Sequence, residues 1–205
     1  MKLRILAPLM LGLSFAAAAS FAAPAMVGQP APMFSATDPS GKLVSLAEFK
    51  GKTVVLEWVN PECPYVRKHY DSANMQATQK AATAKDVVWL SVNSTHPSHF
   101  DHKKPAEMAA WTKAQRAAPT ATLLDGDGKI GRSYGARTTP HMYVVDAKGT
   151  LVYAGGIDDK PSANPADVKS AKNLVNAALA DVLAGRAVAQ PVTRAYGCSV
   201  KYADS

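Results

Sequence analysis

Strand-like and helix-like segments alternate along this chain, and the alternation restricts the folds that it can adopt. Two apolar and β-branched runs, TVVLEWV (53–59) and VVWLSVN (87–93), have the length and composition of buried strands. Helical patterns follow them at 64–84 and 105–118, and each starts with a proline, which the first helical turn tolerates. We therefore expect an α/β sandwich with helices on both faces of a mixed sheet.

The second half of the chain continues this pattern. A short strand is expected at 121–125, and two more at 141–146 and 150–155, where a tight turn between them predicts a hairpin. Residues 164–185 carry apolar side chains at intervals of three and four, which indicates an amphipathic helix that ends at Gly185.

The N-terminal residues indicate export. Lys2 and Arg4 precede an apolar, alanine-rich stretch that ends in Ser20-Phe21-Ala22, as is typical of a secretory signal peptide. We expect cleavage after Ala22 and a periplasmic or otherwise exported protein that forms one domain from residue 23 to 205, without stable membrane insertion. An uncleaved N-terminal anchor is the alternative.

The charge balance is mildly basic. The chain has 23 Lys and Arg against 16 Asp and Glu, a formal net charge of +7. The basic residues are scattered, with doublets only at 67–68 and 103–104, whereas a nucleic-acid-binding surface requires them to be clustered. We expect no nucleic-acid partner.

Cys63 lies where the first apolar run gives way to a helix, in the sequence NPECPYVRKHY (60–70). Free N–H groups and the helix dipole favour a thiolate at that position, and Arg67, Lys68 and His69 add positive charge nearby. Cys63 is therefore the candidate nucleophile. Glu57 lies inside the preceding strand, so it is either a buried acid with a raised pKa that carries protons, or a solvent-facing residue of an edge strand.

The stretch LEWVNPECP resembles the active site of the thioredoxin-like superfamily, in which a buried acid precedes the reactive cysteine by six residues, as Glu57 does here. ARTTPHMYVVDAKGTLVYAGGIDD (136–159) resembles the stretch of that superfamily in which a Thr and a cis Pro, here Thr139 and Pro140, face the cysteine. Residues 34–56 are similar to the redoxin and alkyl-hydroperoxide-reductase/thiol-specific-antioxidant group. The resemblance implies a three-layer α/β/α sandwich with a mixed central sheet.

The chain departs from this resemblance at the active site. The second cysteine of thioredoxins corresponds to Val66, and the Pro and Thr of the peroxide site of peroxiredoxins correspond to Leu56 and Asn60. CxxC exchange is therefore impossible, and the peroxide site is not reproduced.

A C-terminal tail from about residue 186 carries the second cysteine, Cys198. TRAYGCSVKY (193–202) is similar to the tail of exported peroxiredoxin-like redoxins, and Tyr196 and Tyr202 are candidates to hold it against the body of the protein. The resemblance implies that Cys198 resolves a bond formed at Cys63. A permanent structural disulfide and two free thiols are the alternatives.

We expect an exported thiol–disulfide oxidoreductase, or peroxiredoxin-like redoxin, that acts on protein thiols or disulfides and less favourably on hydroperoxide, with no bound cofactor. The site would comprise Cys63, Cys198, Glu57, Thr139 and Pro140. One alternative is a copper-binding redoxin or metallochaperone that uses Cys63, Cys198, His141 and His69, because thiolates and imidazoles suit copper. Another is a non-catalytic adaptor of the same fold.

Overall fold

The structure is a computed structural model that describes residues 24–203. The predicted signal peptide, residues 1–22, and its cleavage point lie outside the described residues. Between residues 24 and 203, no helix is both long and apolar enough to cross a membrane.

A seven-stranded sheet forms the centre of the molecule, with strand order β2-β1-β5-β4-β3-β7-β8. Strands β3, β4 and β5 run parallel to one another, and the remaining neighbours pair antiparallel, so the sheet is mixed as predicted. The strands are β1 (Ser35–Thr37), β2 (Leu43–Ser45), β3 (Val54–Trp58), β4 (Val88–Asn93), β5 (Ala121–Leu124), β7 (His141–Val145) and β8 (Leu151–Gly155).

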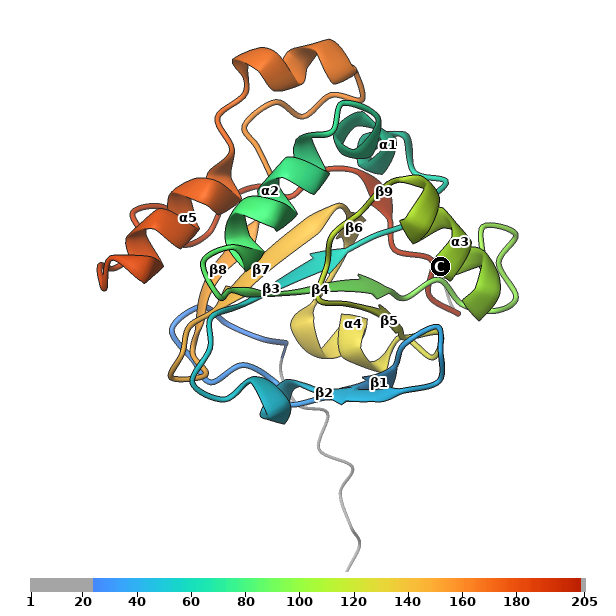
Figure 1. Cartoon of the computed structure of the whole chain (residues 1–205), viewed down its shortest axis with the longest axis horizontal. Coiled ribbons are helices and arrows are strands. Elements are labelled where there is room, and N and C mark those ends of the chain that lie inside the picture. The colour runs from blue at the N-terminus through green and yellow to red at the C-terminus, as the bar shows by residue number, and fades with distance from the viewer. Residues whose placement is uncertain (1–23, 204–205) are drawn as a thin grey trace, which may run out of the picture.

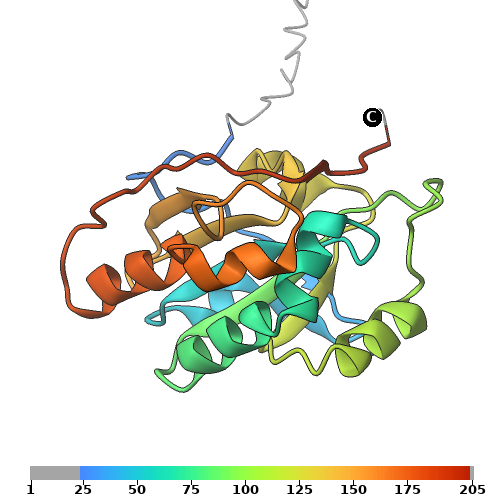
Figure 2. The ribbon, with the colours of Figure 1, turned by 90° about the horizontal axis from the view of Figure 1, so that it is seen from above.

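Helices cover both faces of this sheet, which confirms the predicted sandwich (Figures 1 and 2). On one face lie α1 (Pro64–Asp71), α2 (Asn74–Thr83), α3 (Pro105–Ala114) and α5 (Leu174–Leu183); on the other lie α4 (Lys129–Tyr134) and the 3₁₀ helix η1 (Leu46–Phe49). Because β3 is buried on both faces, its side chains alternate between two cores: Leu56 and Trp58 pack towards α4, while Val55 packs towards α1 and α2.

Three predicted helices differ from those observed. The segment 64–84 is two helices, because Ala73 adopts a left-handed conformation with φ of 61° between α1 and α2. The segment 164–185 begins as the 3₁₀ helix η2 (Pro165–Ser170), and α5 starts only after Asn173, whose side chain caps it. The segment 105–118 is helical only as far as Ala114.

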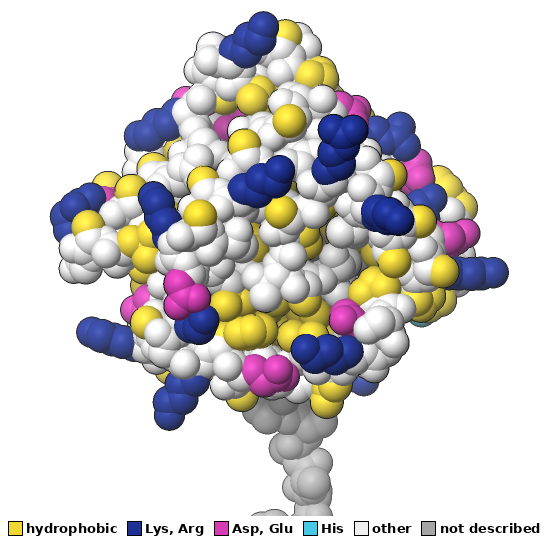
Figure 3. Space-filling view, in the orientation of Figure 1, with side chains coloured by type: hydrophobic (Ala, Val, Ile, Leu, Met, Phe, Trp, Pro, Cys, Tyr) yellow, Lys and Arg dark blue, Asp and Glu magenta, His cyan; other side chains and the backbone are white. Residues whose placement is uncertain are grey.

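After α5 the chain runs back across the molecule, past β8 and the start of α1, as the red segment of Figure 2 shows. Its strand β9 (Cys198–Ser199) pairs antiparallel with β6 (Thr138–Thr139), which directly precedes Pro140. The tail is therefore part of the folded body. On the face shown in Figure 3, Lys and Arg side chains are spread out rather than gathered into one patch.

Candidate functional site

Cys63 occupies the N-cap position of α1, with Pro64 in the first helical turn as predicted. Its side chain is only 2% exposed, and the thiol donates a hydrogen bond to the carbonyl oxygen of Thr139 at 3.0 Å. The cationic side chains expected to act on Cys63 are paired elsewhere: Arg67 contacts Glu62 at 2.5 Å, and Lys68 contacts Asp158 at 3.0 Å. Their influence on Cys63 is therefore weaker than the sequence suggests.

The peptide bond between Thr139 and Pro140 is cis, which confirms the prediction from the sequence. Thr139 is buried at the end of β6. Its carbonyl oxygen accepts the hydrogen bond from the Cys63 thiol, and its backbone pairs with Cys198 of the tail. This short strand therefore joins the two segments that carry the cysteines.

Cys198 lies opposite Thr139 in the register of β6 and β9, and the Cys63 thiol donates to the carbonyl oxygen of the same Thr139. Burial, and next the interaction with the neighbouring Cys63, raise the pKa of Cys198 to about 12, while Lys201 opposes the rise. Both cysteines are thiols in this structure. The fold thus brings together two thiols that lie far apart in the sequence.

The approach of the tail depends on Gly197. Its φ of +141° is one that residues with side chains rarely adopt, and a Cβ at this position would collide with the carbonyl group of Thr139. Glycine immediately before Cys198 therefore lets the two backbones meet.

Glu57 is fully buried, so the prediction of a buried acid is confirmed and the solvent-facing alternative is wrong. The carboxylate accepts hydrogen bonds from Tyr70 (2.8 Å), Trp89 (2.8 Å), Ser91 (2.9 Å) and Gln79 (3.1 Å). Burial raises the pKa of Glu57, and these four donors oppose the rise. None of the four is a cysteine, so these hydrogen bonds hold the Glu57 carboxylate without using either thiol.

The two histidines of the copper alternative are held by other groups. Both ring nitrogens of His69 are engaged, Nε2 with the Tyr196 hydroxyl at 3.2 Å and Nδ1 with the Asn74 amide at 2.9 Å. His141 Nδ1 contacts the Tyr143 hydroxyl at 3.1 Å. Burial lowers the pKa of His69 and of His141 to about 4. Within residues 24–203 there is no group of three or more His, Cys, Asp or Glu placed to hold a metal.

Sequence reasoning missed two polar clusters beside the thiols. Lys68, Asp158 and Tyr196 form a buried network. Asn60 donates to Asp101 at 3.1 Å, and the charge of Asp101 contributes to the raised pKa of Cys198. The sequence offered Tyr196 as an anchor for the tail, but nothing in it indicates that Asp158, near the end of the stretch 136–159, is the partner.

The comparisons with known proteins agree with this geometry. Residues 27–154, more than half of the chain, match the AhpC/TSA family; the matched region includes Cys63 and Pro140 but ends before Cys198. The thiol-disulfide oxidoreductase ResA of Bacillus thuringiensis subsp. konkukian is 26% identical over 133 residues, which cover 62% of this chain and 67% of that protein.

Two solved structures share the fold. An uncharacterized conserved protein from Geobacillus kaustophilus is 24% identical, with a TM-score of 0.74 over 88% of this chain and 94% of the other. The thioredoxin domain of a thiol-disulfide oxidoreductase from Bacteroides vulgatus is 26% identical, with a TM-score of 0.51 over 63% of this chain and 87% of the other. The fold is thioredoxin-like, and this chain belongs to the AhpC/TSA family.

Proposed function

We propose that this protein is a thiol–disulfide oxidoreductase in which Cys63 is the nucleophile and Cys198 the resolving thiol. The observation that carries the proposal is that both cysteines meet at Thr139, beside a cis proline: the Cys63 thiol donates to the Thr139 carbonyl oxygen, and Cys198 pairs with Thr139 in the register of β6 and β9. The relative named a thiol-disulfide oxidoreductase supports the same chemistry.

In the first step, the Cys63 thiolate attacks one sulfur of a target disulfide. The Cys63–target bond forms as the target S–S bond breaks, and one target thiolate leaves. Because Cys63 is 2% exposed beneath β9, the tail has to move aside before a protein disulfide can reach it.

In the second step, the Cys198 thiolate attacks the Cys63 sulfur, and the second target thiolate leaves. The interaction with Cys63 contributes to the raised pKa of Cys198, and a Cys63 sulfur in a mixed disulfide can no longer ionise, so this contribution is lost. The pKa of Cys198 therefore falls at the step in which Cys198 has to act as the nucleophile. The proton that its thiol loses passes to solvent. Overall, Cys63 and Cys198 are oxidised to one disulfide, and the target disulfide is reduced to two thiols.

A protein disulfide is a better candidate substrate than a hydroperoxide. Leu56 and Asn60 occupy the positions of the Pro and Thr of the peroxide site, and the Asn60 amide is engaged by Asp101. We also propose that the protein acts outside the cytoplasm, where disulfides persist; the signal-like residues 1–22 support this.

Paired serine variants test the function. With a disulfide-bonded protein substrate, Cys198→Ser should accumulate a mixed disulfide at Cys63, whereas Cys63→Ser should accumulate none. The unmodified chain should form a Cys63–Cys198 disulfide with a midpoint above about −250 mV, since structural disulfides lie below about −300 mV. A bridge that resists reduction, or equal behaviour of the two variants, would overturn the proposal.

A further inference from the structure

A buried polar cluster links the tail to the helix that carries Cys63. Lys68, on α1, contacts Asp158 at 3.0 Å, the Lys160 carbonyl oxygen at 2.7 Å and the Tyr196 hydroxyl at 3.1 Å. The side chains of Lys68 and Asp158 are 0% and 2% exposed. Tyr196 donates a hydrogen bond to the second carboxylate oxygen of Asp158.

The Tyr196 hydroxyl completes this cluster. Two buried charges are tolerated only if their remaining hydrogen-bonding positions are filled, and Tyr196 supplies an acceptor to Lys68 and a donor to Asp158. The low pKa of His69 leaves its imidazole neutral, so it adds no charge where it meets the same hydroxyl. The Lys68–Asp158 pair thus forms a hydrogen-bonding site for the Tyr196 hydroxyl of the tail.

The cluster lies close in sequence to both cysteines. Tyr196 lies two residues before Cys198, and Lys68 lies five residues after Cys63. On the other side of Cys198, the buried Val200 donates a backbone hydrogen bond to the Arg137 carbonyl oxygen at 3.0 Å. Cys198 is therefore held between two anchors, and the one at Tyr196 reaches the helix of the nucleophile directly.

We propose that Tyr196 is a positioning residue for Cys198: its hydroxyl, held by the Lys68–Asp158 pair, keeps the resolving thiol against Cys63 and keeps the tail closed over the nucleophile. This inference rests on the proposed exchange function. It assigns Lys68, Asp158 and Tyr196 a role that acts through the position of Cys198.

Tyr196→Phe removes the hydroxyl while retaining the ring, which packs edge-on against Tyr65 with centroids 5.9 Å apart. A looser tail lowers the effective concentration of Cys198 at Cys63. We expect the equilibrium constant of the Cys63–Cys198 disulfide against glutathione to fall about tenfold, which corresponds to a midpoint about 30 mV less negative. In the Cys198→Ser background, Cys63 should be alkylated about tenfold faster when Tyr196→Phe is added.

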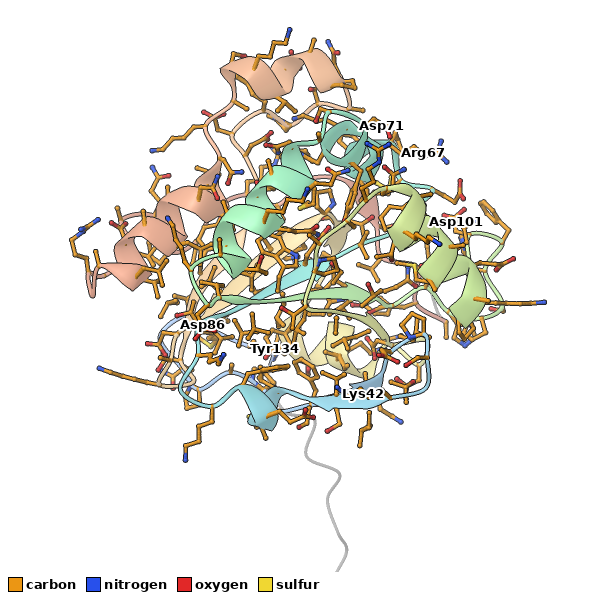
Figure 4. All side chains as sticks on the ribbon, in the orientation of Figure 1. Lys42, Arg67, Asp71, Asp86, Asp101 and Tyr134 are labelled. Atoms are coloured by element: carbon orange, nitrogen blue, oxygen red, sulfur yellow. The ribbon has the colours of Figure 1, made fainter. Side chains whose placement is uncertain are left out.

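Tyr134→Phe is the matched control, because it also removes a buried tyrosine hydroxyl, one that donates to the Pro32 carbonyl oxygen at 2.9 Å. Tyr134 lies across the sheet from α1, as its position relative to Arg67 and Asp71 in Figure 4 shows. The Tyr134→Phe variant should have the same Cys63–Cys198 redox midpoint and the same Cys63 alkylation rate as the chain without this change. The inference is overturned if Tyr196→Phe behaves like this control while the unmodified chain exchanges its disulfide; absence of a reversible disulfide in the unmodified chain overturns the proposed function with it.

Discussion

Glu57 shows how one buried acid depends on its surroundings. The carboxylate has four hydrogen-bond donors, from α1, α2 and β4, and none of them is cationic. Its pKa is raised because hydrogen bonds replace only part of the hydration that burial removes. The protonated form is therefore favoured more strongly in the folded protein than in the unfolded chain.

This raised pKa makes stability depend on pH. Glu57 contributes its full stabilisation at pH values below its pKa in the unfolded chain, about 4.3, and this stabilisation is lost as pH rises through its higher pKa in the folded protein. The loss is about 1.4 kcal/mol for each pH unit that separates the two pKa values. Glu57→Gln retains hydrogen-bonding capacity but cannot ionise. We expect the free energy of unfolding of the unmodified chain to fall relative to that of Glu57→Gln between pH 4 and pH 8, measured by urea denaturation.

Glu107→Gln is the control, because it also removes one carboxylate, but from an exposed position on α3. Its free energy of unfolding should follow that of the unmodified chain across this pH range. A difference between wild type and Glu57→Gln that stays constant across this pH range would contradict the prediction.

At the residue scale, the sequence predicts what local context determines. Glu57 is flanked by apolar and β-branched residues, which favours burial, although the sequence also allows a solvent-facing position on an edge strand. Cys63 stands out from its immediate neighbours, and the cis Pro140 follows from the resemblance of residues 136–159 to the thioredoxin-like superfamily. The pairing of Lys68 with Asp158 was not, because it joins residues 90 positions apart, and only the fold determines which loop lies beside α1.

The elements follow the same division. The apolar runs become β3 and β4, as their composition requires. The interruption of the predicted helix at 72–73 depends instead on Ser72, whose hydroxyl bonds to the Lys68 carbonyl oxygen at 2.6 Å, and on the left-handed Ala73. The late start of α5 likewise depends on a long-range contact, from the Asn173 amide to the Thr78 hydroxyl at 3.0 Å.

The pairing of β9 with β6 can be tested at Gly197. Gly197→Ala places a methyl group against the Thr139 carbonyl group at a φ unsuited to alanine, so β9 has to move away from β6. We expect a loss of about 1–3 kcal/mol in the free energy of unfolding of the reduced protein. Slower formation of the Cys63–Cys198 disulfide should accompany it, followed by trapping of free thiols.

Gly126→Ala controls for the substitution itself, because a Cβ there meets only the Pro97 side chain at 3.5 Å and no unusual φ is required. If Gly197→Ala matched this control in both stability and disulfide formation, the tail would not depend on the close approach at Thr139.

At the scale of the whole molecule, the tail adds a long-range connection to the matched family region, which ends at residue 154. Its hydrogen bonds reach β8 through Pro191 and Thr193, the loop between β4 and α3 through Lys201, and α1 through Tyr196. These contacts hold Cys198 at Cys63 before any bond forms, so oxidation should proceed with little rearrangement of the fold.

A disulfide between Cys63 and Cys198 would close most of the chain into one loop, and this gives the last prediction. Closing so long a loop lowers the entropy of the unfolded chain, and the loop model sets the resulting stabilisation at roughly 5 kcal/mol at most. We expect the oxidised protein to unfold at a higher urea concentration than the reduced protein. A variant with both cysteines changed to serine should show no effect of oxidant. Equal urea midpoints for oxidised and reduced protein, with the bridge verified by mass spectrometry, would contradict the prediction, because bond strain in the native state would then cancel the gain although both cysteines already meet at Thr139.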